Sequence, residues 1–344
     1  HCSGKGVSRV SKRDHILVGL DIGTTKICAI VAEVPEEGPL NIIGVGSCPS
    51  RGLRKGVVVN IESTVESIKK AVEEAELMAA VQINSVYTGI AGSHISGENL
   101  KGVVALKKQE VTRDDISRAV ESARTLAVIP HERRILHVLP REFMVDDQEG
   151  VREPLGMSGN RLEVNVHVIT GAVTSAQNII KSVNRAGLDV VDIILQPLAS
   201  SEAVLSAEER ELGVAMVDLG GGTTDLAIFL DGSIRHTAVL PIGGQNLTKD
   251  LAIGLLTSQT DAEKIKVQHG IARTELVHGH QMVEVPSVGD RPPRQFTRRD
   301  IAEILEPRVE EMFDLVKREI VRAGYEGMLG AGVAQATGAA VARP

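Results

Sequence analysis

Two stretches decide the fold: VGLDIGTT at residues 18–25 and MVDLGGGTT at residues 216–224. Each is an apolar run that ends in or near an aspartate, followed by a turn of glycine and threonine and then by a second apolar run. This pattern predicts a strand, a hairpin turn and a second strand in both places. A single D-x-G motif is a common tight turn, but two copies in matching contexts indicate a duplicated site.

The two turns have the composition of phosphate-binding loops. Glycine lets successive backbone N–H groups point at one spot, and threonine hydroxyls add further donors. An aspartate beside such a turn repels phosphate, so we expect Asp21 and Asp218 to hold hydrated Mg²⁺ against a polyphosphate. The chain has no G-x-x-x-x-G-K-[ST] motif and its turns lead into strands, which excludes a P-loop or Rossmann site.

Composition favours a cytoplasmic α/β protein of about two domains. The 344 residues are 42% hydrophobic but only 2% aromatic, and they include 34 glycines. The net charge of 38 − 45 = −7 and the scarcity of aromatic residues exclude a general nucleic-acid binder. Cys2, Cys28 and Cys48 form no C-x-x-C pair, which fits a reducing compartment and neither a zinc site nor a disulfide framework.

Apolar periodicity predicts the elements around the first turn. Strands are expected at Ile16–Ile22, Ile27–Val34 and Asn41–Ser47. A helix is expected from an S-x-x-E capping box at Ser63 to about Ala80. Strands that flank a turn, followed by a helix, are the expected start of an α/β domain.

The chain is expected to contain two duplicated mixed-sheet domains with an insertion. The block 97–161 is more charged and less apolar than its surroundings, which indicates an inserted subdomain. The predicted organisation is a disordered or non-native extension at 1–13, a first domain at 14–96 and 162–206, the insertion at 97–161, and a second domain at 207–344 with a smaller subdomain at about 245–300. A long helix over Arg299–Ala323 is expected to be disturbed at Pro307, because proline removes a helix hydrogen bond.

The sequence resembles the FtsA family of bacterial cell-division proteins, within the actin, heat-shock-chaperone and sugar-kinase superfamily. The resemblance runs from about Asp14 to Gly332 and rests on VGLDIGTTKICAIVAEV, GIAGSHISGENLKGVVAL, QPLASSEAVL, VDLGGGTTDLAIF and PIGGQNLTKDLA. It implies an actin-like ATPase fold with an FtsA-type subdomain at 97–161. It also implies ATP and Mg²⁺ as cofactors.

The resemblance implies roles for individual residues. Asp21 and Asp218 would lie near the metal, and Gln196 would orient the attacking water in slow hydrolysis at most. The implied nucleotide contacts are Gly23, Thr24, Thr25 and Lys26 in the first loop, Gly220, Gly221, Gly222, Thr223 and Thr224 in the second, Gly243 and Gly244 beneath the nucleotide, and Glu263 and Lys266 at the ribose and adenine. An ordinary exposed i, i+3 ion pair explains the spacing of Glu263 and Lys266 equally well.

The resemblance implies assembly and binding rather than turnover. The implied partners are the C-terminal peptide of FtsZ at about 245–300, other division proteins at 97–161, and further copies of the chain in filaments at the division site, on the cytoplasmic face of the membrane. The family ends in an amphipathic membrane helix, whereas here a degenerate echo of its adenine motif, GVAQ at 332–335, is followed by no such segment. We therefore expect a truncated second domain, and membrane anchoring only in a longer chain.

Two other functions stay open on the sequence. One is a pilus-assembly actin-like ATPase, a relative that shares the phosphate loops. The other is a small-molecule kinase or polyphosphatase of the same superfamily, which would need a general base near a substrate hydroxyl. No residue of the sequence is identifiable as that base.

Overall fold

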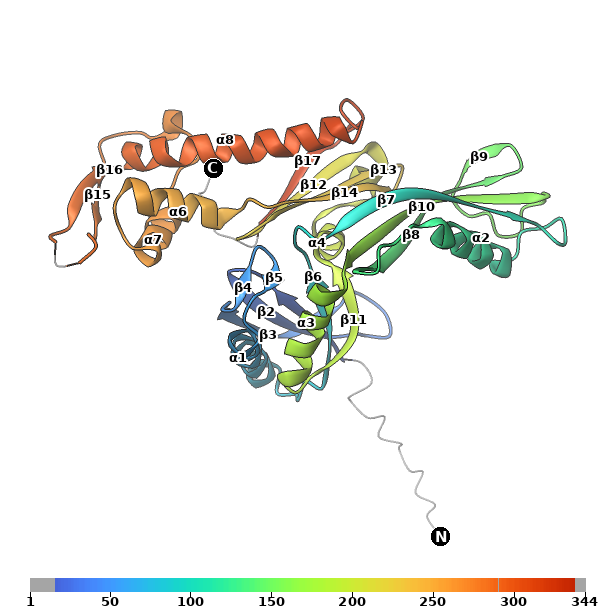
Figure 1. Cartoon of the computed structure of the whole chain (residues 1–344), viewed down its shortest axis with the longest axis horizontal. Helices are drawn as coiled ribbons and strands as arrows, with labels where there is room; N and C mark the ends of the chain where they lie inside the picture. Colours follow the sequence, from blue (N-terminus) through green and yellow to red (C-terminus); the bar gives the residue numbers. More distant parts are fainter. Residues whose placement is uncertain (1–15, 290, 338–344) are drawn as a thin grey trace, which may run out of the picture.

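The structure, a computed structural model, describes residues 16–289 and 291–337 (Figure 1). The predicted extension at 1–13 and the last seven residues lie outside these ranges. The described chain forms three larger sheets, one for each predicted domain and one for the insertion, with two short hairpins beside them. Within the described ranges, no helix has both the length and the apolar character needed to cross a membrane.

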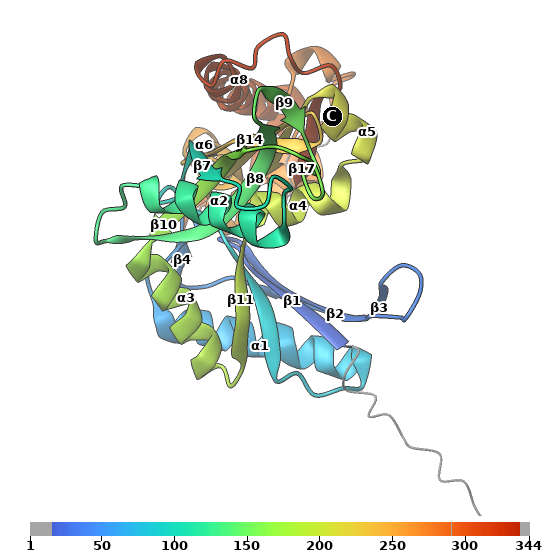
Figure 2. The same cartoon turned by 90° about the vertical axis from the view of Figure 1, so that its right-hand side faces the viewer.

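The first sheet has the strand order β11-β6-β1-β2-β3. Its strands are β1 (Ile16–Ile22), β2 (Lys26–Glu33), β3 (Asn41–Pro49), β6 (Ser85–Ile90) and β11 (Asp189–Leu195). Helices α1 (Ile61–Ala79) and α3 (Val173–Arg185) lie together against this sheet (Figure 2). The strands predicted around the first turn are confirmed within two residues, whereas the capping box at Ser63 is wrong. Asn60 caps α1 instead, because its side chain accepts a hydrogen bond from the Ser63 N–H.

The inserted sheet has the order β7-β10-β8-β9. It comprises β7 (Ser96–Ala105), β8 (Arg133–Val145), β9 (Gln148–Val151) and β10 (Arg161–Ala172), with helix α2 (Arg113–Leu126) packed on it. The predicted insertion ends at residue 161 and so leaves β10 in the first domain, which differs from this sheet. Strand β10 pairs along its length with both β7 and β8, so it is a central strand of the insertion.

Two short helices, α4 (Gln196–Val204) and α5 (Ala207–Leu212), connect the first sheet to the sheet of the second domain. This second sheet has the order β14-β13-β12-β17, formed by β12 (Val214–Leu219), β13 (Thr224–Leu230), β14 (Ser233–Leu240) and β17 (Gly332–Thr337). The duplication predicted from the two turns is visible here, because β12 and β13 form an antiparallel hairpin like that of β1 and β2.

The smaller subdomain lies beyond this sheet, at one end of the molecule (Figure 1). It comprises α6 (Gly244–Gly254), α7 (Gln259–His269), the 3₁₀ turn η1 (Thr274–Leu276), β15 (Met282–Val285) and β16 (Arg294–Thr297), with the long helix α8 (Arg298–Arg322) alongside. The long helix predicted over Arg299–Ala323 is confirmed within one residue at each end, and α8 runs through Pro307 as one element. Its apolar side chains on both sides of the proline, including Leu305 and Met312, are buried in one core, and this packing offsets the lost hydrogen bond.

Candidate functional site

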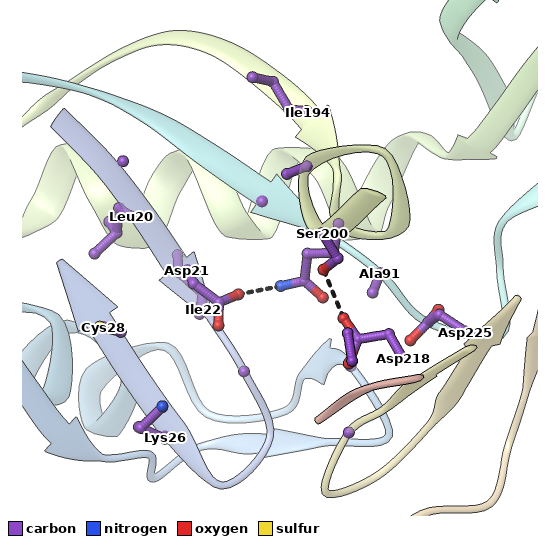
Figure 3. A pocket seen from close by; sticks show the side chains of 18 of the residues that line it. Leu20, Asp21, Ile22, Lys26, Cys28, Ala91, Ile194, Ser200, Asp218 and Asp225 are labelled. Atoms are coloured by element: carbon purple, nitrogen blue, oxygen red, sulfur yellow. Dashed lines mark hydrogen bonds between the residues drawn. The ribbon is translucent and has the colours of Figure 1, made fainter. Parts of the chain in front are cut away.

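The turns of the two hairpins face each other across a cavity of about 960 Å³ (Figure 3). Of the predicted site residues, those that line it are Asp21, Gly23, Thr24, Thr25, Lys26, Gln196, Asp218, Gly220, Gly221, Gly222 and Thr223. The first strands of the two hairpins begin 198 residues apart in the sequence (214 − 16), so only the tertiary fold brings these residues together. The cavity has the size of a ligand site for a molecule such as a nucleotide.

The two turns have the same backbone hydrogen bond. Gly23 N–H donates to Lys26 O over 3.0 Å, and Gly220 N–H donates to Thr223 O over 2.9 Å. A side chain on Gly23 would place its Cβ 2.8 Å from the Lys26 carbonyl oxygen, closer than real Cβ atoms approach. Glycine is therefore required by the turn itself, before any contribution to anion binding.

Helix α4 supplies one hydrogen bond to each of the two predicted metal-binding aspartates. Gln196 Nε2 donates to Asp21 Oδ1, and Ser200 Oγ donates to Asp218 Oδ2 over 2.7 Å. Residues 196 and 200 are one helical turn apart and lie on the same face of the helix. The carboxylates of the two hairpins are thus held from a single short element.

A third aspartate, which the sequence analysis did not predict, lies beside these two. Asp225 is the cross-strand partner of Asp218 in the second hairpin and lines the cavity. Its Oδ2 accepts a hydrogen bond from Thr223 Oγ1 over 3.0 Å, and its buried Oδ1 has no partner among the residues that the structure describes. The only sequence signal is its place directly after the second turn, where alternation in a strand does not reveal which face it occupies.

Burial raises the pKa of all three aspartates, and repulsion by Asp218 raises the pKa of Asp21 and Asp225 further. Burial first, and then the charge of Asp218, raises the pKa of Asp21 to about 6, although Lys26 opposes this shift. The same two causes raise the pKa of Asp225 to about 7, and burial raises the pKa of Asp218. Without a nearby cation, simultaneous ionisation of the three carboxyl groups is unfavourable, and a bound cation would stabilise their ionised forms.

These residues fit a hydrated cation that is shared with a ligand. Within 16–289 and 291–337, no group of three or more His, Cys, Asp or Glu side chains is arranged to hold a metal ion alone. Mg²⁺ keeps several waters and binds through one or two carboxylates together with phosphate oxygens. Asp21 and Asp218 beside two glycine turns supply that donor set, and the unpaired Asp225 oxygen adds a buried acceptor.

The remaining predicted residues lie around the second loop rather than on the cavity wall. Thr224 is buried and donates its hydroxyl to Ile242 O over 2.9 Å, so it supports the loop from behind. Gly243 lies directly under the loop, because its Cβ would be 2.6 Å from Gly220 O. Gly244 N–H donates to the same oxygen over 3.0 Å. These contacts fix the position of the second loop relative to the start of helix α6.

Glu263 and Lys266 form an ion pair that is not an ordinary exposed one. Lys266 is 2% exposed, and its Nζ donates to Glu263 Oε2 over 2.8 Å, to Thr248 Oγ1 over 2.9 Å and to Gly244 O over 3.2 Å. The buried ammonium thus joins α7 to the start of α6. Gln335, in the GVAQ segment at 332–335, and Ala336 also line the cavity from β17. Neither residue was predicted to be a site residue.

Comparison with known proteins decides the family. A family profile described as "SHS2 domain inserted in FTSA" matches residues 92–170, and one described as "Cell division protein FtsA" matches residues 215–342. The chain is 53% identical over 318 residues to the cell division protein FtsA of Pseudomonas aeruginosa, covering 92% of this chain and 76% of that protein. The chain belongs to the FtsA family. It is therefore an actin-like cell-division protein.

Other relatives agree. Identity is 47% to FtsA of Escherichia coli K12, which covers 94% of this chain and 79% of that protein, and 41% to FtsA of Bacillus subtilis, which covers 92% and 72%. The chain thus spans about three quarters of the length of these relatives.

Solved structures show the actin-like fold. A PilM-PilN type IV pilus biogenesis complex matches with a TM-score of 0.65 at 17% identity, covering 94% of this chain and 81% of that one. MreB5 of Spiroplasma citri bound to ADP matches with a TM-score of 0.53 at 13% identity, covering 94% and 85%. At these identities the likeness concerns the fold alone, so the pilus-assembly alternative gains no support beyond a shared architecture.

Proposed function

We propose that this cell-division protein binds Mg²⁺-ATP in the cavity between its two hairpin turns, and that binding prepares the chain for assembly. The observation that carries the proposal is the meeting of two matching glycine turns and three neighbouring aspartates on one cavity. MreB5, with the same fold, has been solved with ADP and with AMPPNP. That likeness supports an adenine nucleotide as the ligand.

Different residues of the chain would bind the phosphate groups and the metal ion. Turn N–H groups and the Thr24 and Thr25 hydroxyls would bind phosphate oxygens, and Asp21 with Asp218 would hold the metal. Bound Mg²⁺ would supply positive charge that neutralises phosphate oxygens and the aspartate carboxylates. The cavity is lined by the first turn, from the first domain, and by the second turn, from the second domain. A ligand that contacts both turns therefore stabilises one arrangement of the two domains.

The site favours slow hydrolysis at most. Gln196 is the side chain for which the family resemblance implies contact with the attacking water, and a neutral amide can orient water but cannot accept its proton. Positioning and charge neutralisation supply most of the catalysis in phosphoryl transfer, so the remaining groups still permit a low rate. An output of assembly rather than product follows from this arrangement.

The FtsZ C-terminal peptide is the proposed partner of the smaller subdomain at about 245–300. Large apolar side chains are exposed there, among them Ile253, Leu256 and Met282. Of the arginines in this region, Arg294 donates to Leu255 O and Arg298 donates to His269 O, so both stiffen the subdomain. Other division proteins at the insertion, filament formation, and action at the division site on the cytoplasmic face of the membrane complete the proposal.

Calorimetry with ATP tests the nucleotide site. We expect binding in the micromolar range or tighter with Mg²⁺ present, and its loss in Asp218→Ala. The exposed Asp147→Ala variant, remote from the cavity, serves as the matched control. Absence of Mg²⁺-dependent binding in the unaltered, folded chain would refute the nucleotide proposal.

Fluorescence polarisation with a labelled FtsZ C-terminal peptide tests the partner. Met282→Asp should weaken binding, because it places a charge on an exposed apolar side chain of the proposed surface. Leu77→Asp is the control, since Leu77 is equally an exposed apolar residue but lies on α1 of the first domain. Equal binding by the two variants would move the peptide away from β15.

A further inference from the structure

A short turn in the first domain touches both phosphate loops. Strands β4 (Leu53–Arg54) and β5 (Val57–Val58) form a hairpin whose two-residue turn is Lys55-Gly56. Gly56 lines the cavity, and its N–H donates to Thr24 Oγ1 over 2.9 Å. The turn thereby holds the hydroxyl of a first-loop residue.

The other side of the turn packs against the second loop. A Cβ on Gly222 would lie 2.9 Å from Lys55 Cα and 3.1 Å from Lys55 N. The backbone of Lys55 therefore rests directly on the glycine of the opposite domain, and no larger residue fits there. The turn sets how closely the two loops approach each other at this point.

The turn is also fixed from behind and is conformationally strained. A Cβ on Gly56 would lie 2.9 Å from Gly92 Cα and 3.0 Å from Ala91 O. Lys55 has φ 50° and Gly56 has φ 74°, which are the left-handed angles of the tight hairpin turn that asparagine and glycine favour. A lysine in this conformation persists where its surroundings hold it, and such strain is concentrated at functional sites.

The hydrogen bond determines what the Thr24 hydroxyl can do. A threonine hydroxyl has one proton to donate and two lone pairs. Gly56 N–H occupies a lone pair, and Thr24 makes no other hydrogen bond within the ranges that the structure describes. The Thr24 proton thus stays available to an acceptor at the cavity, and a phosphate oxygen is such an acceptor.

We propose that the Lys55-Gly56 turn is a positioning element of the phosphate site, which orients the Thr24 hydroxyl as a donor and sets the spacing between the two loops. This inference rests on the proposed nucleotide function and adds the element that positions its loops. Lys55 acts here through its backbone, since its side chain is exposed and does not line the cavity.

A double-mutant cycle on ATP affinity tests the inference. Gly56→Ala and Thr24→Val should each weaken ATP binding by about tenfold, the equivalent of one hydrogen bond. The double variant should lose no more than the worse single variant, because both changes break the same contact. Thr24→Ser keeps the oxygen and should restore binding.

Gly150→Ala is the matched control for backbone strain. Gly150 has φ 70°, close to that of Gly56, but a Cβ there would have no atom within 4 Å. Its ATP affinity should equal that of the unaltered chain. If Gly56→Ala binds ATP as tightly as Gly150→Ala, or if the two losses in the cycle add, the inference is overturned while the nucleotide proposal stands.

Amide hydrogen exchange at Gly56, measured without nucleotide, gives a second test that does not need the glycine variant to fold. The Gly56 N–H should be protected in the unaltered chain and in Thr24→Ser, and should exchange faster in Thr24→Val. Equal protection in Ser and Val variants would overturn the inference. A folded, unaltered chain that binds no ATP would instead overturn the proposed function and this inference with it.

Discussion

The hydroxyl of Ser200 donates a hydrogen bond of 2.7 Å to the carboxylate of Asp218. Asp218 belongs to the second hairpin, whereas Gln196, one turn earlier on α4, donates to Asp21 of the first hairpin. Helix α4 follows β11 of the first sheet directly and packs against β12 and β13 of the second. It therefore connects the charged groups of both halves of the site.

Ser200→Ala should weaken Mg²⁺-dependent ATP binding by about tenfold to a hundredfold, since a hydrogen bond to a charged group contributes roughly 1.5–3 kcal/mol. The lost bond leaves burial to raise the pKa of Asp218 further, so less carboxylate is available to a cation. Calorimetric titration at several Mg²⁺ concentrations measures the effect. Ser201→Ala is the control, because that hydroxyl donates to Leu198 O instead. A Ser200 variant with an unchanged Mg²⁺ dependence would contradict the assignment.

Gln196→Glu should also reduce ATP affinity, and by more at low Mg²⁺ than at high. The change replaces a hydrogen-bond donor to Asp21 with a negative charge. Burial and the charge of Asp218 already disfavour the ionised form of Asp21, and a second carboxylate beside it would disfavour that form further. Gln196→Ala removes the donor without adding charge and should lose less affinity, while slowing any hydrolysis. Binding assays across Mg²⁺ concentrations separate the two variants, and identical losses would exclude an electrostatic cause.

In the ligand-free chain, the contribution of the aspartate cluster to the free energy of unfolding should be larger at pH 5 than at pH 8. Their pKa values rise from 3.8 to about 6 for Asp21 and to about 7 for Asp225, so the folded state binds more protons over this window. The contribution is complete below about pH 4 and is lost as the pH rises through 6 and 7.

Asp225→Asn isolates this effect, because it removes the charge at nearly constant shape. Its melting temperature should exceed that of the unaltered chain by roughly 3 °C or more at pH 8, with the gain shrinking towards pH 5. Calorimetric melting without nucleotide or metal measures it. Asp147→Asn, on the exposed β8–β9 turn, should give no pH-dependent difference. A gain of equal size at both pH values would point to packing rather than charge.

Local sequence patterns were sufficient to predict the two hairpins. Strand β1 has the predicted bounds Ile16–Ile22, and both glycine turns end in the expected second strand, because alternation and turn chemistry act over a few residues. The same reasoning mistook the start of α1, where Asn60 competes successfully with Ser63 as the cap. The continuity of α8 through Pro307 likewise depends on tertiary packing.

Long-range pairing explains what the sequence left hidden. Asp225 reaches the site through its register opposite Asp218, and Lys55 reaches it because a hairpin of the first domain touches a loop of the second. Burial of Lys266 depends on acceptors from α6, which lie 18 and 22 residues away. None of these contacts has a local signature, since each requires knowing which elements lie side by side.

A polar contact joins the insertion to the second domain. His167, on β10, is 1% exposed and bonds Asn99 Oδ1 through Nδ1 over 2.7 Å and Thr237 Oγ1 through Nε2 over 2.9 Å. An amide oxygen only accepts, so Nδ1 carries the proton and Nε2 accepts from the Thr237 hydroxyl. Burial, followed by electrostatic interaction with His236 and Arg141, lowers the pKa of His167 to about 3, which keeps the ring neutral.

His167→Ala should lower the free energy of unfolding by about 3 kcal/mol, because it leaves buried partners on Asn99 and Thr237 unsatisfied and removes a buried ring. Urea unfolding at pH 7 measures the loss, and His131→Ala, at an exposed position, should change it by less than about 0.5 kcal/mol. His167 also predicts acid sensitivity of the opposite sign to the aspartates. The unfolded ring binds protons below about pH 6.5 while the folded ring resists them down to about pH 3, so its contribution is lost as the pH falls through that window. His167→Gln should reduce this acid-dependent loss, and a variant that retains the full loss would place its origin elsewhere.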